Sequence, residues 1–183
     1  MSLLLAFLPF IVFAVANGFT SPTLALFLAA LVSLVLLLRD RLILGKAPKI
    51  LDIGTTILFG GLALCVLLGG AMESIFAVRL AVDAGLLAIV LISIAVRRPF
   101  TLQYAREQVA HEFWDNPVFI RTNYIITSVW ALAFTVMAAA DAILLYAPEI
   151  PTNVGIVATI AALAGAVRFT GWYPKRVRQT AGG

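Results

Sequence analysis

Three charged residues stand inside stretches of the sequence that are otherwise hydrophobic. Arg79 and Asp83 are four residues apart, so on a helix they share one face. Asp141 stands in a second apolar stretch, about as far from the end of that stretch as Arg79 is from the start of its own. Two carboxylates and one guanidinium at the same depth could bind a cation or a proton, with the arginine controlling access. They could equally form a buried ion-pair network that fixes how the helices pack.

Two further polar residues stand near the same ends of apolar stretches. Glu73 closely precedes the stretch that holds Arg79, and Asn17 ends the first apolar stretch of the chain. We expect both at the rim of the cluster. A charge inside a bilayer costs about 3 kcal/mol or more unless it is paired, so such residues mark a functional site by default.

The composition defines the solvent around these residues. Of the 183 residues, 62% are hydrophobic and 12% are charged, with a mean hydropathy of +1.05. Globular domains are about half apolar and a quarter charged. This chain cannot cover its surface with polar groups, so a lipid bilayer must surround it. The net charge of +4 comes from basic residues beside the apolar stretches, which is typical of a membrane topology signal and does not indicate nucleic acid.

Apolar stretches of about 20 residues span a membrane as helices. The sequence holds six, so we predict an all-α, polytopic membrane protein with a single membrane domain over residues 1–183. The first stretch ends in Ala14-Val15-Ala16, as a signal peptide does. No basic residue precedes it and a second span follows at once, so we expect it to be retained. The predicted spans are residues 3–17, 23–38, 52–70, 75–96, 124–146 and 154–170.

The six spans form three hairpins, and the two kinds of connection differ in charge. Short polar turns join the two spans of each hairpin, whereas the segments between hairpins and the C-terminal segment are basic. All of the 13 Lys and Arg residues except Arg79 lie on that basic side. The positive-inside rule places this side, and with it both termini, in the cytoplasm.

Small residues recur at every fourth position of the last span. Ala158, Ala162 and Ala166 share one face, with Gly165 alongside. Such faces let helices approach closely, which matters because lipid provides no hydrophobic drive between them. We predict that the last span packs tightly against the fifth.

The longest loop, residues 97–123, carries an amphipathic pattern. Its apolar residues are spaced by three and four, which predicts a helix over about residues 101–115 that lies on the cytoplasmic membrane surface. Arg97 and Arg98 precede this helix, and we expect them to bind lipid head-group phosphates. The apolar positions are Leu102, Ala105, Val109 and Phe113.

The sequence offers little for catalysis or metal binding. Its one cysteine, Cys65, allows no internal disulfide, and its one histidine, His111, allows neither paired haem ligands nor a multi-histidine zinc site. We therefore expect no cofactor, no metal and no enzymatic activity. Asp52 begins the third span, where a carboxylate suits the positive end of a helix.

Several short motifs resemble those of a known family. They are Leu8-Pro9 in the first span, Arg97-Arg98-Pro99 after the fourth, Phe113-Trp114 in the loop, Trp130-Ala131 with Phe134 in the fifth, and Pro148 in the last turn. In these motifs and in its spans, the chain resembles the intracellular septation protein A family of bacterial inner-membrane proteins. The resemblance implies envelope maintenance or cell division through partners or lipids, without catalysis. The chain departs from the family pattern at Asp141, where a neutral amide is usual.

Three hypotheses for the function follow. The first is a non-enzymatic protein of the bacterial inner membrane, alone or as a homo-oligomer, that supports envelope maintenance or septation by binding lipids or other inner-membrane or division proteins. The second is a small cation- or proton-coupled transporter or channel that uses Arg79, Asp83 and Asp141. The third is an accessory subunit of a larger membrane complex.

Overall fold

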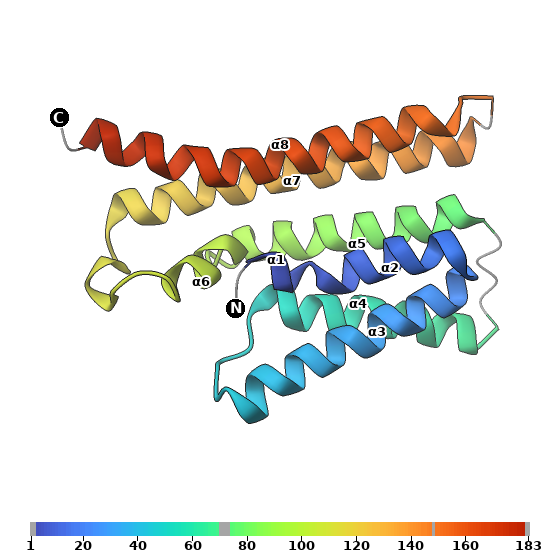
Figure 1. Ribbon diagram of the computed structural model, residues 1–183, viewed down its shortest axis with the longest axis horizontal. Coiled ribbons are helices and arrows are strands. Elements are labelled where there is room, and N and C mark those ends of the chain that lie inside the picture. Colours follow the sequence, from blue (N-terminus) through green and yellow to red (C-terminus); the bar gives the residue numbers. More distant parts are fainter. Residues whose placement is uncertain (1–2, 70–73, 148, 182–183) are drawn as a thin grey trace.

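The helices of this protein run along one common direction (Figure 1). The computed structural model describes residues 3–69, 74–147 and 149–181, and every regular element in these ranges is helical. Two of the elements are single turns, a π-helical turn at Arg39–Ile43 and a 3-10 turn at His111–Phe113. The α-helices are α1 (Leu3–Ala6), α2 (Leu8–Phe19), α3 (Pro22–Leu38), α4 (Ile50–Leu67), α5 (Ile75–Ala95), α6 (Phe100–Arg106), α7 (Pro117–Tyr146) and α8 (Thr152–Ala181).

Among the residues that the structure describes, five helices are long and apolar enough to cross a membrane. They are α3 with the π-helical turn that continues it, α4, α5, α7 and α8. These helices support the predicted polytopic, all-α architecture. The apolar helix α2 has 12 residues, which makes about 18 Å of helix.

The predicted first span, residues 3–17, is divided into two helices. The division falls at Phe7, where φ is −87° and ψ is −1°. Pro9 explains the break, because a proline has no N–H to donate to the carbonyl of Leu5 and its ring crowds that carbonyl.

Two other predicted spans are longer in the structure. The predicted fifth span corresponds to α7. This helix begins at Pro117 and not at residue 124, because the side chain of Asn116 accepts hydrogen bonds from the first free N–H groups. The last helix, α8, continues to Ala181 and not to residue 170. Hydropathy falls where the polar residues begin, whereas the backbone hydrogen bonds continue past that point.

The predicted surface helix over residues 101–115 is wrong in its length. Helix α6 ends at Arg106, and only the 3-10 turn follows before α7. The indole N–H of Trp114 donates a 3.1 Å hydrogen bond to the carbonyl of Arg106, and the Arg106 guanidinium donates a 3.2 Å bond to the carbonyl of Trp114. The carbonyl of Arg106, which would accept a backbone N–H if the helix continued, thus accepts a side-chain hydrogen bond instead.

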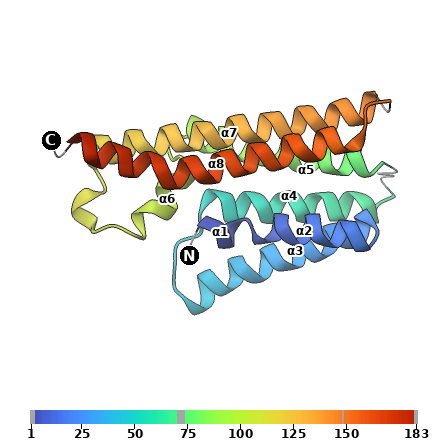
Figure 2. The same cartoon turned by 45° about the horizontal axis from the view of Figure 1, so that its top comes forward.

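The helices pack in a definite order across the bundle. Helices α7 and α8 form one edge and α3 forms the other, with α2, α4 and α5 between them, in both views (Figures 1 and 2). The most extensive contacts join α5 to α7, α7 to α8, α2 to α3, and α3 to α4. Helix α1 begins, and α8 ends, at the end of the bundle that carries α6, which we call the α6 end (Figure 1).

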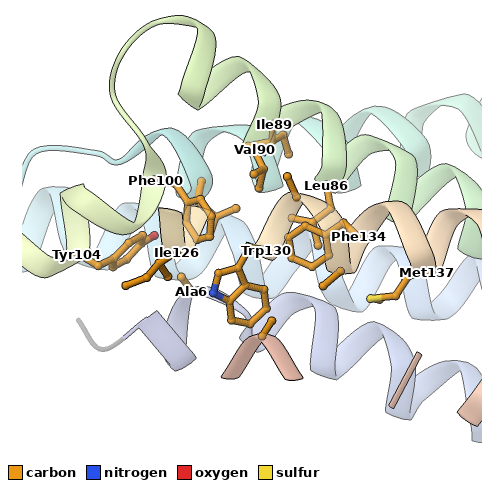
Figure 3. Packing of buried hydrophobic residues seen from close by; sticks show 14 residues of the cluster. Ala6, Leu86, Ile89, Val90, Phe100, Tyr104, Ile126, Trp130, Phe134 and Met137 are labelled. Atoms are coloured by element: carbon orange, nitrogen blue, oxygen red, sulfur yellow. The ribbon is translucent and has the colours of Figure 1, made fainter. Parts of the chain in front are cut away.

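Aromatic rings fill the core near the α6 end. The rings of Phe7 and Trp130 are stacked with their centroids 4.7 Å apart, and Phe134 and Phe100 pack against both. Figure 3 shows Trp130 beside Phe134 and Phe100, with Tyr104 and Ile126 at the edge of the cluster. The break at Phe7 thus places the half-buried ring of this residue against the core.

Helix α8 packs through small residues, but Gly165 takes no part. Ala166 is buried, Ala158 and Ala162 are half-buried, and Gly155 lies so close to Leu144 that a side chain at residue 155 would clash. Gly165 is exposed, and no atom of another part of the described chain lies within 4 Å of where its Cβ would be.

Candidate functional site

The predicted charged cluster lies between α5 and α7. The guanidinium Nη2 of Arg79 is 2.9 Å from Oδ1 of Asp141, whose side chain is fully buried, while 23% of the Arg79 side chain is exposed. Arg79 is about 6 Å along α5 from its first residue, and Asp141 is about 7.5 Å along α7 from its last. These depths match because α5 and α7 run in opposite directions.

Asp83 lies one turn further along α5 and is also buried. Its carboxyl group lies beside that of Asp141, and the charge of Arg79 acts on both carboxyl groups, although the ion pair of Arg79 is with Asp141. Charges at this depth require partners. The Arg79–Asp141 pair therefore fixes the register of α5 against α7. Asp83 is a second carboxyl group, which this ion pair does not require.

The other predicted rim residues are not shown to join this cluster. Asn17 lies near the end of α2, and its amide oxygen is buried without a hydrogen bond from the described part of the chain. Glu73 lies outside the described residues. Arg97 and Arg98 are exposed after the end of α5, at the opposite end of that helix from Arg79.

The turn at Arg97 has an uncommon backbone conformation. Arg97 has a φ of +57°, and the N–H of Arg98 donates a 2.9 Å hydrogen bond to the carbonyl of Ser93. This is the Schellman pattern of helix ends, in which the left-handed position usually holds glycine. An arginine therefore occupies this position at a cost to folding, which points to a use for its exposed guanidinium.

A second polar cluster, at the α6 end, did not emerge from the sequence. The ammonium of Lys49 is buried, 2.9 Å from Oε1 of Glu107 and 4.7 Å from the centre of the Tyr104 ring. Lys46 lies 3.3 Å from Oε2 of Glu107. The hydroxyl of Tyr104 donates a 2.6 Å hydrogen bond to Oδ1 of Asp52. These contacts fasten α6 and the residue that follows it to the start of α4.

The surroundings of this cluster shift the pKa values of two of its members. Burial, assisted by the carboxylate of Asp52, raises the pKa of Tyr104, so its hydroxyl remains a donor. Burial tends to raise the pKa of Glu107, but hydrogen bonds and charge from cations, Lys49 among them, outweigh it and lower this pKa to about 2.

Polar bonds also fasten α6 to its other neighbours. The hydroxyl of Thr101 donates to the carbonyl of Asn123 at 2.9 Å and lies 2.7 Å from the hydroxyl of Thr127, both on α7. The side chain of Gln103 accepts from the N–H of Ile50 and donates to the carbonyl of Arg98, each at 3.0 Å. The position of α6 is thus determined by bonds to three other segments.

A pocket of about 730 Å³ opens beside this fastened segment. Its walls come from α6 and the chain after it, from the first turns of α7 and from the end of α8. Arg178 is the only charged residue among its described lining residues. The apolar lining includes Ala105, Val109, Phe113, Phe119, Ile126 and Val177, and the polar lining includes Thr101, Tyr104, Gln108, Asn116, Thr122 and Asn123.

The part of the chain that the structure describes offers no group of three or more His, Cys, Asp or Glu side chains that could hold a metal ion. Comparison with known proteins finds no match to this chain among protein families, curated proteins or solved structures.

Proposed function

We propose that this chain is a six-span protein of the bacterial inner membrane with its α6 end in the cytoplasm. In this arrangement α1 and α2 together form the first span, which makes six spans with the five long helices, and both termini are cytoplasmic. The basic residues support it, because all Lys and Arg residues except Arg79 lie in the connections at the α6 end, in the first turns of α7 or in the second half of α8. Its resemblance to the septation protein A family gives the same topology.

The protein works by binding and not by catalysis, in support of envelope maintenance or septation. The pocket beside α6 carries this proposal. Its volume of about 730 Å³ lies within the range of about 300–1,000 Å³ that is usual for ligand sites. A wall of nine apolar residues, seven polar residues and one cation fits an amphiphile with an anionic head, such as an anionic phospholipid.

The position of the pocket fits the same ligand. On α8 the pocket residues Pro174, Val177 and Arg178 directly follow Trp172 and Tyr173. Aromatic residues of this kind mark the boundary between the acyl chains and the head groups. A lipid could therefore place its acyl chain in the apolar part while its phosphate reaches Arg178. Fastening α6 to α4 and α7 keeps this pocket formed without a ligand.

Native mass spectrometry of the protein released from nanodiscs tests the proposal. The nanodiscs contain equal amounts of phosphatidylglycerol and phosphatidylcholine. We expect retained phosphatidylglycerol on the native protein, and less of it on Ala105→Phe, which places a ring in part of the pocket, and on Arg178→Gln. Lys175→Gln is the matched control, because Lys175 is a neighbouring exposed cation that does not line the pocket. Equal retention of both lipids, or equal loss in the control, contradicts the proposal.

A second candidate is cation- or proton-coupled transport through the cluster of Arg79, Asp83 and Asp141. The observation that favours it is a fully buried carboxylate, Asp141, whose oxygens accept no aligned hydrogen bond within the described chain. Neither of the cavities described for this protein is lined by these three residues. Ion flux into liposomes that survives Asp83→Asn removes this role for Asp83.

A role as an accessory subunit of a larger complex would show in another way. A partner would then co-purify in a fixed ratio after mild solubilisation, and partner-free protein would be unstable. Growth and division of a deletion strain that expresses the pocket variant Ala105→Phe would connect either kind of binding to septation.

A further inference from the structure

A second, much smaller cavity lies between α1, α2, α3 and α4. Its volume is about 10 Å³, which is close to that of one water-sized sphere. Three of its six lining residues carry side-chain oxygen atoms, and they come from two helices. The lining residues are Ala6, Pro9, Ser33, Leu36, Asp52 and Thr55.

One of these oxygens has no partner. The residue Thr55 is 1% exposed, and its hydroxyl makes no hydrogen bond within the described chain. Its neighbour Thr56 donates to the carbonyl of Asp52 at 2.9 Å, which is the usual solution for a hydroxyl on a membrane helix. A buried hydroxyl without a partner costs about 1–3 kcal/mol, so a ligand in the cavity is expected.

The two other oxygen-bearing side chains, those of Ser33 and Asp52, can coordinate a cation. The hydroxyl of Ser33 donates to the carbonyl of Ala30 at 2.8 Å, which leaves its lone pairs available. Asp52 receives its one described side-chain hydrogen bond from a neutral hydroxyl, that of Tyr104. The charge of Lys49 also acts on Asp52, but its 2.9 Å ion pair is with Glu107.

The first helical segment is broken at this cavity. Ala6 and Pro9, on the two sides of the division at Phe7, both line it. A broken membrane helix frees backbone carbonyls, and freed carbonyls at such breaks coordinate Na⁺ in membrane proteins. A proline in this place also leaves the carbonyl of Leu5 without its helical donor.

We propose that this cavity binds one alkali cation, held by the Asp52 carboxylate and the hydroxyls of Thr55 and Ser33. A single charge balances the carboxylate. The cavity is partly open, so water can complete the coordination of the cation. The proposal does not depend on lipid binding in the larger pocket, and its test measures no lipid.

The test is the thermal unfolding of the full-length protein in detergent, after exchange into choline chloride. Titration with NaCl or KCl at constant ionic strength is expected to raise the melting temperature until the site is saturated. Either salt supports the proposal if the effect saturates. If choline, sodium and potassium chloride give the same melting temperature, a water molecule fills the cavity and the proposal is overturned.

Two substitutions of similar size locate the effect. Thr55→Val removes the unpartnered hydroxyl and is expected to weaken the apparent cation affinity roughly tenfold or more, because each contact to a charge contributes about 1.5–3 kcal/mol. Thr56→Val is the control, since Thr56 does not line the cavity. An unchanged salt effect in Thr55→Val contradicts the proposed site. Ser33→Ala gives the same test from α3 if Thr55→Val does not fold.

Discussion

The hydroxyl of Tyr104 and the carboxylate of Asp52 are joined by a 2.6 Å hydrogen bond, although 52 residues separate them in the sequence. Tyr104 also lines the large pocket, and Asp52 also lines the small cavity. One contact therefore connects the two binding sites proposed for this protein. It is also one of the contacts that hold α6 against the start of α4.

Removing this hydroxyl tests how much the contact contributes to the fold. A hydrogen bond to a charged group typically contributes about 1.5–3 kcal/mol, and Tyr104 is almost fully buried. We expect Tyr104→Phe to lower the free energy of unfolding by about that amount, measured by denaturant titration in detergent. Tyr146→Phe is the control, because Tyr146 is 81% exposed. Equal effects of the two substitutions would mean that the bond contributes nothing specific.

The ion pairs of Glu107 predict how stability depends on pH. The pKa of Glu107 falls from 4.5 in the unfolded chain to about 2 in the folded protein. A lowered pKa adds stability above about pH 4.5, and this contribution disappears as the pH falls toward 2. We expect the melting temperature of native protein to exceed that of Glu107→Gln at pH 7, with a difference that shrinks below pH 4.5. Glu112→Gln, at an exposed site in the 3-10 turn, should show no such trend.

The spans could be predicted from the sequence because a helix surrounded by acyl chains must consist mainly of apolar residues, which raises its hydropathy. The predicted limits of the spans 23–38, 52–70 and 75–96 lie within three residues of those of α3, α4 and α5. The start of α7 was predicted too late, because Arg121 and Asn123 lower the hydropathy of its first turns. Asn116 followed by Pro117 is a helix-start signal that would have corrected it.

The two polar clusters differ in how far the sequence reveals them. The matching depths of Arg79 and Asp141 can be read from two apolar stretches, although their contact requires α5 to pack on α7. The cluster of Lys49, Tyr104 and Glu107 could not be predicted, since no local pattern pairs residues more than 50 positions apart. It depends on where α6 ends, and the bonds between Arg106 and Trp114 decide that.

The left-handed backbone at Arg97 predicts a substitution that stabilises the protein. A side chain in this conformation costs about 1 kcal/mol or slightly more, and glycine avoids most of that cost. We expect Arg97→Gly to raise the free energy of unfolding by up to about 1 kcal/mol. Arg98→Gly is the control, because Arg98 does not have a positive φ. If Arg97 holds lipid phosphates, Arg97→Gly should also reduce binding to phosphatidylglycerol vesicles while the fold becomes more stable.

The buried pair of Arg79 and Asp141 allows stability and function to be separated. Removing one partner of a buried ion pair costs about 3–5 kcal/mol, because the other charge remains buried without compensation. We therefore expect Arg79→Ala and Asp141→Asn to lower the amount of folded protein in the membrane. The triple variant Arg79→Met with Asp83→Asn and Asp141→Leu, which leaves no charge in the cluster, should recover much of it. A triple variant no better folded than the single ones would show that the cluster does more than balance charge.

Asp83→Asn then separates the two roles proposed for the cluster, because Asp83 exceeds what the ion pair needs. In a deletion strain, we would measure complementation by Asp83→Asn beside the amount of folded protein. Loss of complementation at a normal protein level would give Asp83 a function of its own and favour transport. If activity falls only as far as the protein level falls, the cluster is structural, because a carboxylate that only assists packing has no other way to affect growth. The function must then lie at the α6 end.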